Sequence, residues 1–455
     1  MSNDTIAQRD IAKELYGSIV GNRWMQLIAG MVFEILLSNY QYSFTLFTPG
    51  MEQEFTGIPY AKIAGIFSFF ILFQTWPMPV AGYLVDKFGI RKLVSLGSAG
   101  MLLGWLLGGT IAKSIFGLYI CYGVIAGVST GIINIAVIAN ALKWFPDRRG
   151  LAVGLTSSGY AGGAAFAIIP IASTITAMGW AGTMAVWGIA QGGIALVMAL
   201  MLRHPPEGWV PAGWQQQAQK ITTVVAQTKV QYAWHQTLRR PEFYLLYVIF
   251  ICVTTGGLMT TGNLSKIAKS LNVANTKMLG LAIVPFTATL CAITNASARI
   301  IWGLISDRLG REHTMALAFM IEAVLIFLVT QITGSPMLFV LLLPLVFLAW
   351  GEIFSLFSAV TGDIFGTRNA TANYGMLFTG KGVASILAGY GAALLAGALA
   401  GSFTVPYYIA AMLDAFAALL AFFALKPLIR NRIAKEVLKE ATGAEFAKST
   451  ARTIT

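Results

Sequence analysis

Charged residues are scarce in this chain of 455 residues: Asp, Glu, Lys and Arg together make up 11% of it, whereas hydrophobic residues make up 56%. So little polar surface cannot cover a soluble globule of this length, which excludes a soluble domain and indicates a helical membrane protein. The three cysteines, Cys121, Cys252 and Cys291, are odd in number and lie in apolar stretches, so no disulfide framework is predicted.

Motifs of several enzyme classes are also missing. The three histidines, His204, His235 and His313, stand in or beside predicted loops, without cysteines or carboxylates at the spacing of a metal site. No glycine-rich loop of the form G-x-x-x-x-G-K-[ST] occurs, so ATP is not the energy source of this chain. We therefore predict a protein that is not an enzyme and that holds neither metal nor cofactor.

Long apolar runs are abundant, and they set the fold class. A helix that crosses a bilayer needs about 20 mostly apolar residues. Runs of that length predict an all-α membrane protein with twelve spans, at 25–47, 60–83, 93–112, 115–141, 151–172, 181–202, 243–265, 279–305, 314–332, 336–358, 372–400 and 403–426.

The largest polar interval, 203–242, separates six predicted spans from six. We interpret it as a cytoplasmic linker between an N-terminal half, 25–202, and a C-terminal half, 243–426, with a cytoplasmic segment at 1–24 and a cytoplasmic tail at 427–455. If both termini are cytoplasmic, 24 of the 31 Lys and Arg lie on the inner side. This positive-inside bias favours that orientation, so the net charge of +12 reflects topology and not nucleic-acid binding.

A short motif recurs at corresponding places in the two halves. The second span ends in Gly82-Tyr-Leu-Val-Asp86-Lys-Phe-Gly89-Ile-Arg91, and the eighth ends in Gly303-Leu-Ile-Ser-Asp307-Arg-Leu-Gly310-Arg311. The recurrence indicates parallel repeats. The paired motif resembles the signature of the major facilitator superfamily, which implies twelve helices in two pseudo-symmetric halves of six. We expect a conformational gate, separate from the substrate site, formed by Gly82, Asp86, Arg91, Gly303, Asp307 and Arg311.

Two basic residues lie deep inside apolar spans. Arg299 stands eight residues before Asp307, and Lys381 stands nine residues into the span 372–400. At 1.5 Å per residue both are about 12–14 Å from the cytoplasmic edge of a hydrocarbon core about 30 Å thick. A charge at that depth persists only if it faces protein, water or a counter-charge. Two cations at one depth predict an anion site; the alternative is that backbone carbonyls or a buried acid hold each of them.

Several longer strings are similar to those of the bacterial oxalate:formate antiporter family, which is related to the monocarboxylate transporters. They include Gly21-Asn22-Arg23-Trp24, Tyr40-Gln41-Tyr42-Ser43, Trp144-Phe145-Pro146-Asp147-Arg148-Arg149-Gly150, Gly159-Tyr160, Gly362-Asp363-Ile364-Phe365-Gly366-Thr367 and Asn373-Tyr374-Gly375. The resemblance implies that Arg299 and Lys381 bind the substrate carboxylates. It also implies that further cavity positions are Tyr42, Gln41, Tyr160 and Trp350.

Three departures from the family pattern leave the substrate open. Phe354 and Phe378 stand where the oxalate transporter carries Tyr and Trp, so two hydrogen-bond donors are missing from the cavity. Glu352 stands where that transporter has Gly, and it either pairs with a cation, carries a proton, or packs at a helix interface. With a protonated Glu352 the site carries +2 and suits a dicarboxylate, whereas an ionised Glu352 leaves +1, which suits a monocarboxylate or proton symport.

The predicted function is secondary active transport of small carboxylates by alternating access, like the oxalate/formate antiporter, in a monomer of the bacterial inner membrane. Three alternatives remain: a proton-coupled monocarboxylate symporter of the lactate or pyruvate type, an exporter of an unrelated amphiphile, and a carboxylate sensor that transports nothing. Glu34 and Glu322 are interpreted as neutral acids within the bundle or as proton relays, and Asp414 as a packing residue outside the cavity.

Overall fold

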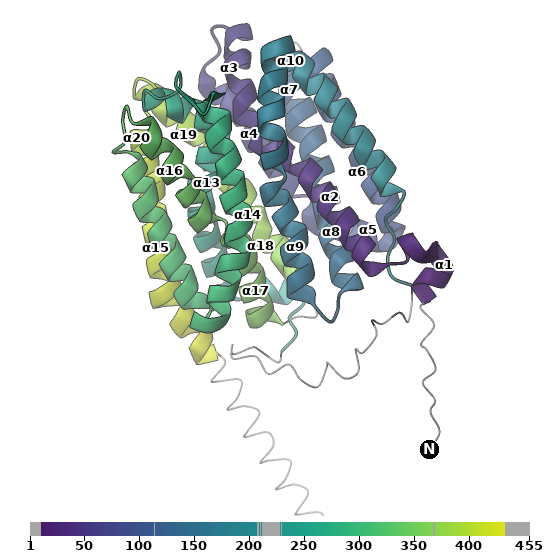
Figure 1. The fold of residues 1–455 in the computed structure, drawn as a ribbon. Coiled ribbons are helices and arrows are strands. Elements are labelled where there is room, and N and C mark those ends of the chain that lie inside the picture. The colour runs from purple at the N-terminus through teal and green to yellow at the C-terminus, as the bar shows by residue number, and fades with distance from the viewer. Residues whose placement is uncertain are drawn as a thin grey trace, which may run out of the picture.

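The computed structural model describes residues 11–112, 114–206, 209, 211, 228, 230–366 and 369–432. Long helices form two groups, which Figure 1 shows side by side, the N-terminal group in purple to teal and the C-terminal group in green to yellow. Parts of the predicted segment 1–24, linker 203–242 and tail 427–455 lie outside the described residues. The predicted boundaries of the two halves therefore stay a prediction.

The N-terminal group consists of membrane-spanning stretches, several of which are broken into two helices. Its elements are α1 (Ile11–Val20), α2 (Arg23–Tyr42), α3 (Phe44–Glu54), α4 (Tyr60–Thr75), α5 (Met78–Phe88), α6 (Ile90–Thr110), α7 (Ile115–Leu118), the π-helix η1 (Tyr119–Ala126), α8 (Gly127–Trp144), α9 (Arg149–Gly162) and α10 (Ala164–Ala199). Asn22 is the N-cap of α2, because its side chain accepts a hydrogen bond from the backbone N–H of Trp24 at 2.9 Å.

The C-terminal group is built in the same way. Its elements are α12 (Trp234–Thr237), α13 (Pro241–Ser270), β1 (Lys277–Met278), β2 (Leu281–Ala282), α14 (Ile283–Leu309), α15 (Arg311–Val329), α16 (Pro336–Trp350), α17 (Ile353–Phe365), α18 (Ala370–Ser385), the π-helix η2 (Ile386–Gly391), α19 (Ala392–Ala398), α20 (Thr404–Leu419) and the π-helix η3 (Leu420–Leu425). The two short strands pair antiparallel between α13 and α14.

Ten helical segments of the described residues are long and apolar enough to cross a membrane. One of them, Leu151–Ala199, turns at Gly179, whose φ of 75° lies in the left-handed region, so this segment supplies two spans. The first span, α2 with α3, is too polar to be among the ten, since it buries Glu34, Asn39 and Gln41. The predicted twelve-helix fold is confirmed, and the chain is a multi-pass membrane protein.

The repeated motif ends both of its helices with the same backbone turn. Gly89 follows α5 with φ 87° and ψ 146°, and Gly310 follows α14 with φ 87° and ψ 155°. A residue with a Cβ pays a steric cost in that region, so each copy of the motif requires its last glycine. The two halves therefore share a local structure at the position where their sequences repeat.

Candidate functional site

A cavity of about 760 Å³ lies between the two helix groups. Its lining includes Gln74, Arg299 and Lys381 from inside the bundle, and Asp307 and Arg311 from the ends of α14 and α15. The Asp307 side chain is 64% exposed, so the cavity reaches solvent at that end. A solute that enters there meets the two deep cations.

Lys381 on α18 is buried, and side chains of the N-terminal group hold its ammonium. Its Nζ donates to Oε1 of Gln41 at 2.8 Å and to Oε1 of Gln74 at 3.1 Å. The Tyr160 hydroxyl completes the network, since it donates to Oε1 of Gln41 at 2.8 Å and accepts from Nε2 of Gln74 at 2.9 Å. These partners are neutral, so the hydrogen bonds position the positive charge without compensating it.

Arg299 on α14 is 5% exposed, and its guanidinium is only partly satisfied. Its Nη1 donates to the backbone oxygen of Ser157 on α9 at 2.6 Å. Its Nε and Nη2 have no hydrogen-bond partner among the described residues. The guanidinium fork matches the two oxygens of a carboxylate, and unpaired buried N–H groups are costly, so the side chain is suited to bind an anion from the cavity.

Aromatic rings wall the site where the cations approach each other. The Phe354 ring centroid lies 4.3 Å from Cζ of Arg299 and 5.7 Å from Nζ of Lys381. The Phe378 ring lies 5.4 Å from the same Nζ, and both rings line the cavity. Trp350 is fully buried and packs on Phe354 with ring centroids 5.5 Å apart, and it is not among the lining residues. It therefore supports the wall from behind.

Tyr42 also lies behind the lining. Its hydroxyl accepts a hydrogen bond from Nδ2 of Asn295 at 2.9 Å, and its ring lies 6.0 Å from that of Tyr160. Two further residues that accept hydrogen bonds from the cations were not predicted from the sequence: Gln74, which binds Lys381, and Ser157, which binds Arg299. Gln74 was open to detection, because it is an amide inside an otherwise apolar run of α4.

Glu34 on α2 is the acid beside the two cations. Nδ2 of Asn134 donates to both of its carboxylate oxygens, at 3.1 and 3.0 Å, and Asn134 lines the cavity. Glu34 is fully buried and interacts electrostatically with both Arg299 and Lys381. No ion pair within 4.0 Å joins it to either cation in the part of the chain that the structure describes.

Glu352 lies in a different environment, next to other acids. It is fully buried, neither of its carboxylate oxygens has a hydrogen-bond partner in the described ranges, and the charge that influences it is that of Glu322. Asp414 interacts with both. The pairing with Arg299 or Lys381 that the sequence left open for Glu352 is not formed in this structure. Among the described residues, no group of His, Cys, Asp and Glu is arranged to hold a metal ion.

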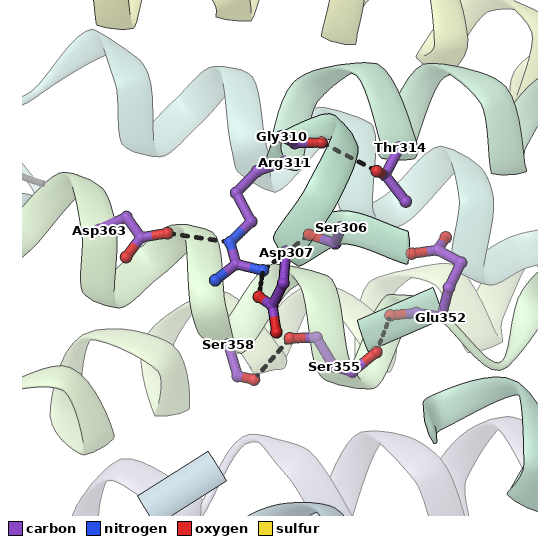
Figure 2. Close-up of polar contacts among 9 residues, drawn as sticks. All are labelled: Ser306, Asp307, Gly310, Arg311, Thr314, Glu352, Ser355, Ser358 and Asp363. Carbon is purple, nitrogen blue, oxygen red and sulfur yellow. Dashed lines mark hydrogen bonds and ion pairs between the residues drawn. The ribbon is translucent and has the colours of Figure 1, made fainter. Parts of the chain in front are cut away.

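The predicted gate residues of the C-terminal half form a network within that half (Figure 2). Arg311 donates from Nη1 to Asp307 at 2.8 Å and to Ser306 at 2.7 Å, and from Nε to Asp363 at 3.1 Å. A side chain at Gly303 would meet no atom within 4 Å, so the helices do not approach closely there.

The N-terminal copy of the gate is only partly visible. A side chain at Gly82 would make ordinary contact with Ile135, at 3.8 Å, and Arg91 is exposed. The Asp86 side chain lies outside the described part of the structure. The locking role of the six residues stays a prediction.

At the opposite end of the bundle, polar contacts join the two helix groups. Oγ1 of Thr45 donates to Oγ of Ser265 at 3.1 Å, and the backbone N–H of Ser265 donates to Thr45 at 2.9 Å. Lys266 forms an ion pair with Glu52 and lies 4.6 Å from the ring centroid of Tyr60. The bundle is therefore closed at the end where α13 runs into α14 and open at the end that carries Asp307.

Comparisons with known proteins agree with this architecture. The family model of the Major Facilitator Superfamily matches residues 24–389 and 267–452. The oxalate:formate antiporter of Oxalobacter formigenes is 31% identical over 372 residues, which cover 82% of this chain and 84% of the relative. Monocarboxylate transporter 9 of Gallus gallus is 37% identical over 81 residues, 18% of this chain and 16% of that protein.

A solved structure supports the fold independently of sequence. The structure of the xylose transporter XylE from E. coli in a partially occluded inward open conformation aligns with a TM-score of 0.67 at 12% identity, over 88% of this chain and 98% of that one. At that identity the likeness concerns the fold alone. With the resemblance found in the sequence thus confirmed, the chain belongs to the major facilitator superfamily and, within it, to the family of the oxalate:formate antiporter.

Proposed function

We propose that the protein is a secondary transporter that exchanges small carboxylate anions across the membrane. The observation that carries the proposal is the convergence of Arg299 and Lys381 on one solvent-connected cavity, at the boundary of the two helix groups. Both cations are buried, and their hydrogen-bond partners among the described residues are neutral, Ser157 for the first and Gln41 with Gln74 for the second. Buried cations without an ion-pair partner favour the binding of an anion.

The contacts outline how a carboxylate is held. The unpaired Nε and Nη2 of Arg299 offer a bidentate hydrogen bond to one carboxylate group. Lys381 offers a compact charge to a second carboxylate, or to the same one, once it releases Gln41 or Gln74. Ser157, Gln41 and Gln74 belong to the N-terminal group, so the hydrogen bonds from Arg299 and Lys381 to them join the two groups. A bound carboxylate replaces some of these hydrogen bonds with its own.

Alternating access follows from the two ends of the bundle. The cavity is open beside Asp307 and closed beside Lys266, so the structure corresponds to one of two access states. Moving between states carries the site through an occluded intermediate, where two cations that form no ion pair are unfavourable. A bound carboxylate compensates them, which favours exchange over return of the empty carrier.

We place the protein in the inner membrane of a bacterium, as a monomer with both termini in the cytoplasm. The excess of Lys and Arg in the loops near Asp307, and the bacterial relative, support this placement. In that orientation the open cavity faces the cytoplasm. Lipid surrounds the exposed apolar side chains, such as Phe166 and Phe423.

A second candidate function is proton-coupled symport of a monocarboxylate, favoured by the acid Glu34 beside the two cations. Uptake of labelled oxalate, formate, lactate and pyruvate into proteoliposomes separates the two. Uptake that requires carboxylate inside the vesicle but no pH gradient establishes exchange, and uptake driven by the gradient alone establishes symport. Absence of uptake with retained binding favours the sensor alternative.

The site assignment is tested in the same assay. Arg299→Ala and Lys381→Ala are expected to abolish uptake while leaving membrane insertion intact. Lys92→Ala removes an exposed cation of α6 and serves as the matched control, with unchanged uptake. Near-normal transport by both site variants contradicts the proposal.

A further inference from the structure

Glu34 shares the site with Arg299 and Lys381 but is bound to neither. Its carboxylate accepts both of its hydrogen bonds from Nδ2 of Asn134, while Arg299 donates to Ser157 and Lys381 to Gln41 and Gln74. The three ionisable groups are close enough to interact electrostatically. Each is therefore held by neutral groups. The Arg299 guanidinium keeps its charge, whereas the Glu34 carboxylate and the Lys381 ammonium can exchange a proton.

The elements around Glu34 bring few other ionisable groups to it. From α14 and α18 come the two cations, and from α9 comes the Tyr160 hydroxyl, which interacts with Glu34 electrostatically. The contribution of α8 is the amide of Asn134, and α10 carries no ionisable side chain between Ala164 and Ala199. On α4 and α3 the ionisable residues stand toward the closed end, as Glu52 and Tyr60 do. The helices α1 and α13 also pack on α2, and none of their ionisable residues is among the charges that act on Glu34.

We propose that Glu34 sets the charge of the carboxylate site by binding and releasing a proton, and thereby selects between mono- and dicarboxylates. The inference rests on the proposed function and extends it to substrate choice. With Glu34 ionised, the two cations and one acid leave the site at +1, which one carboxylate group neutralises. With Glu34 protonated the site carries +2, which a dicarboxylate neutralises.

The structure provides a route by which a proton reaches Glu34, and the charge of the ligand explains why protonation favours a dicarboxylate. Asn134 lines the cavity and touches Glu34, so a proton from water in the open cavity has a short path to the carboxylate. The same charge change acts about twice as strongly on a dianion as on a monoanion, because the Coulomb energy is proportional to the ligand charge. A lower pH therefore favours the dicarboxylate.

The first test measures binding of oxalate and formate to the purified full-length protein from about pH 5.5 to about pH 8, where both probes are ionised. We expect the oxalate affinity to rise by up to about tenfold for each unit that the pH falls, and the oxalate-to-formate affinity ratio to rise with it. Glu34→Gln is expected to keep the high oxalate affinity at every pH.

The matched control is Asp414→Asn, which replaces an equally buried acid on α20 that has no hydrogen-bond partner in the described residues. This control should bind with the same pH dependence as the unmodified protein. A Glu34→Gln protein that keeps the full pH dependence, or an affinity ratio that does not change with pH, overturns the inference.

A second measurement needs no variant. Oxalate binding to the unmodified protein in weakly buffered solution is followed with a pH-indicator dye, and we expect proton uptake that approaches one per oxalate and is smaller for formate. Equal uptake for the two probes, or none, contradicts the role of Glu34 while leaving carboxylate transport standing. If neither probe binds at any pH, the proposed function fails as well.

Discussion

Arg299 on α14 and Lys381 on α18 approach the same phenyl ring, that of Phe354 on α17, at 4.3 and 5.7 Å. Three helices of the C-terminal group thus bring two like charges together around an apolar group. The face of the ring attracts both cations, which offsets part of their mutual repulsion.

Replacing Phe354 should weaken carboxylate binding without disrupting the fold. Phe354→Leu removes a ring that interacts with both cations, at a cost of about 1–2 kcal/mol, so we expect affinity to fall about 5- to 30-fold in a titration calorimeter. Phe354→Tyr keeps the ring face and should bind nearly normally. Phe357→Leu is the control, because that ring packs on Phe250 and lies outside the cavity lining; an equal loss there would contradict the assignment.

Weakening the closed end should shift the protein toward the opposite access state. Lys266→Ala removes the ion pair with Glu52 and the contact with the Tyr60 ring, together about 1–2 kcal/mol, which changes the ratio of states about 5- to 30-fold. Electron–electron double resonance should show longer distances between spin labels attached at positions 56 and 279, where Thr56 and Leu279 stand. Lys269→Ala, on the exposed side of α13, should leave the distances unchanged. An equal change in Lys269→Ala would show that the contacts of Lys266 with Glu52 and Tyr60 do not hold this end closed.

Gly131 allows α8 to pack closely against α4, beside the Gln74 that binds Lys381. A Cβ at this position would lie 2.1 Å from the backbone oxygen of Gln74, so Gly131→Ala must push α4 away at a cost of about 1–3 kcal/mol. We expect a lower melting temperature and weaker substrate binding, because Gln74 holds Lys381. Gly193→Ala, where a Cβ would meet nothing within 4 Å, should be neutral or slightly stabilising. Equal melting temperatures would refute the argument.

The acids around Glu352 should make the fold sensitive to high pH. Burial without partners disfavours their ionised forms, whereas the unfolded chain ionises freely, so stability should fall as the pH rises. Glu352→Gln removes one such acid and should raise the melting temperature more at alkaline than at acidic pH. Glu312→Gln, at a partly exposed acid near the start of α15, is the control. A larger loss of stability at alkaline pH in Glu352→Gln would show that the carboxylate is ionised and stabilised in the fold.

The membrane spans, the repeated motif and the depth of the two cations could be predicted from the sequence. Membrane insertion depends on apolar length and on flanking charge, which are local properties, so the spans and the repeated motif could be read from sequence alone. The depth of Arg299 and Lys381 followed from helix rise, which needs no tertiary information. Their convergence on one cavity came from the resemblance and agrees with the structure.

Tertiary structure decided which neighbours each buried polar group has. The sequence left three roles open for Glu352, near Trp350: pairing with a cation, carrying a proton, or packing at a helix interface. Helix rotation and packing put Glu352 beside Glu322 and bring Glu34, from the other half, to the cations. The positions of Gln74 and Ser157 depend in the same way on how two helix groups meet. Contacts between residues more than 100 positions apart are fixed by packing and not by local periodicity, so the sequence determined the spans and the charges, and the fold determined the partners.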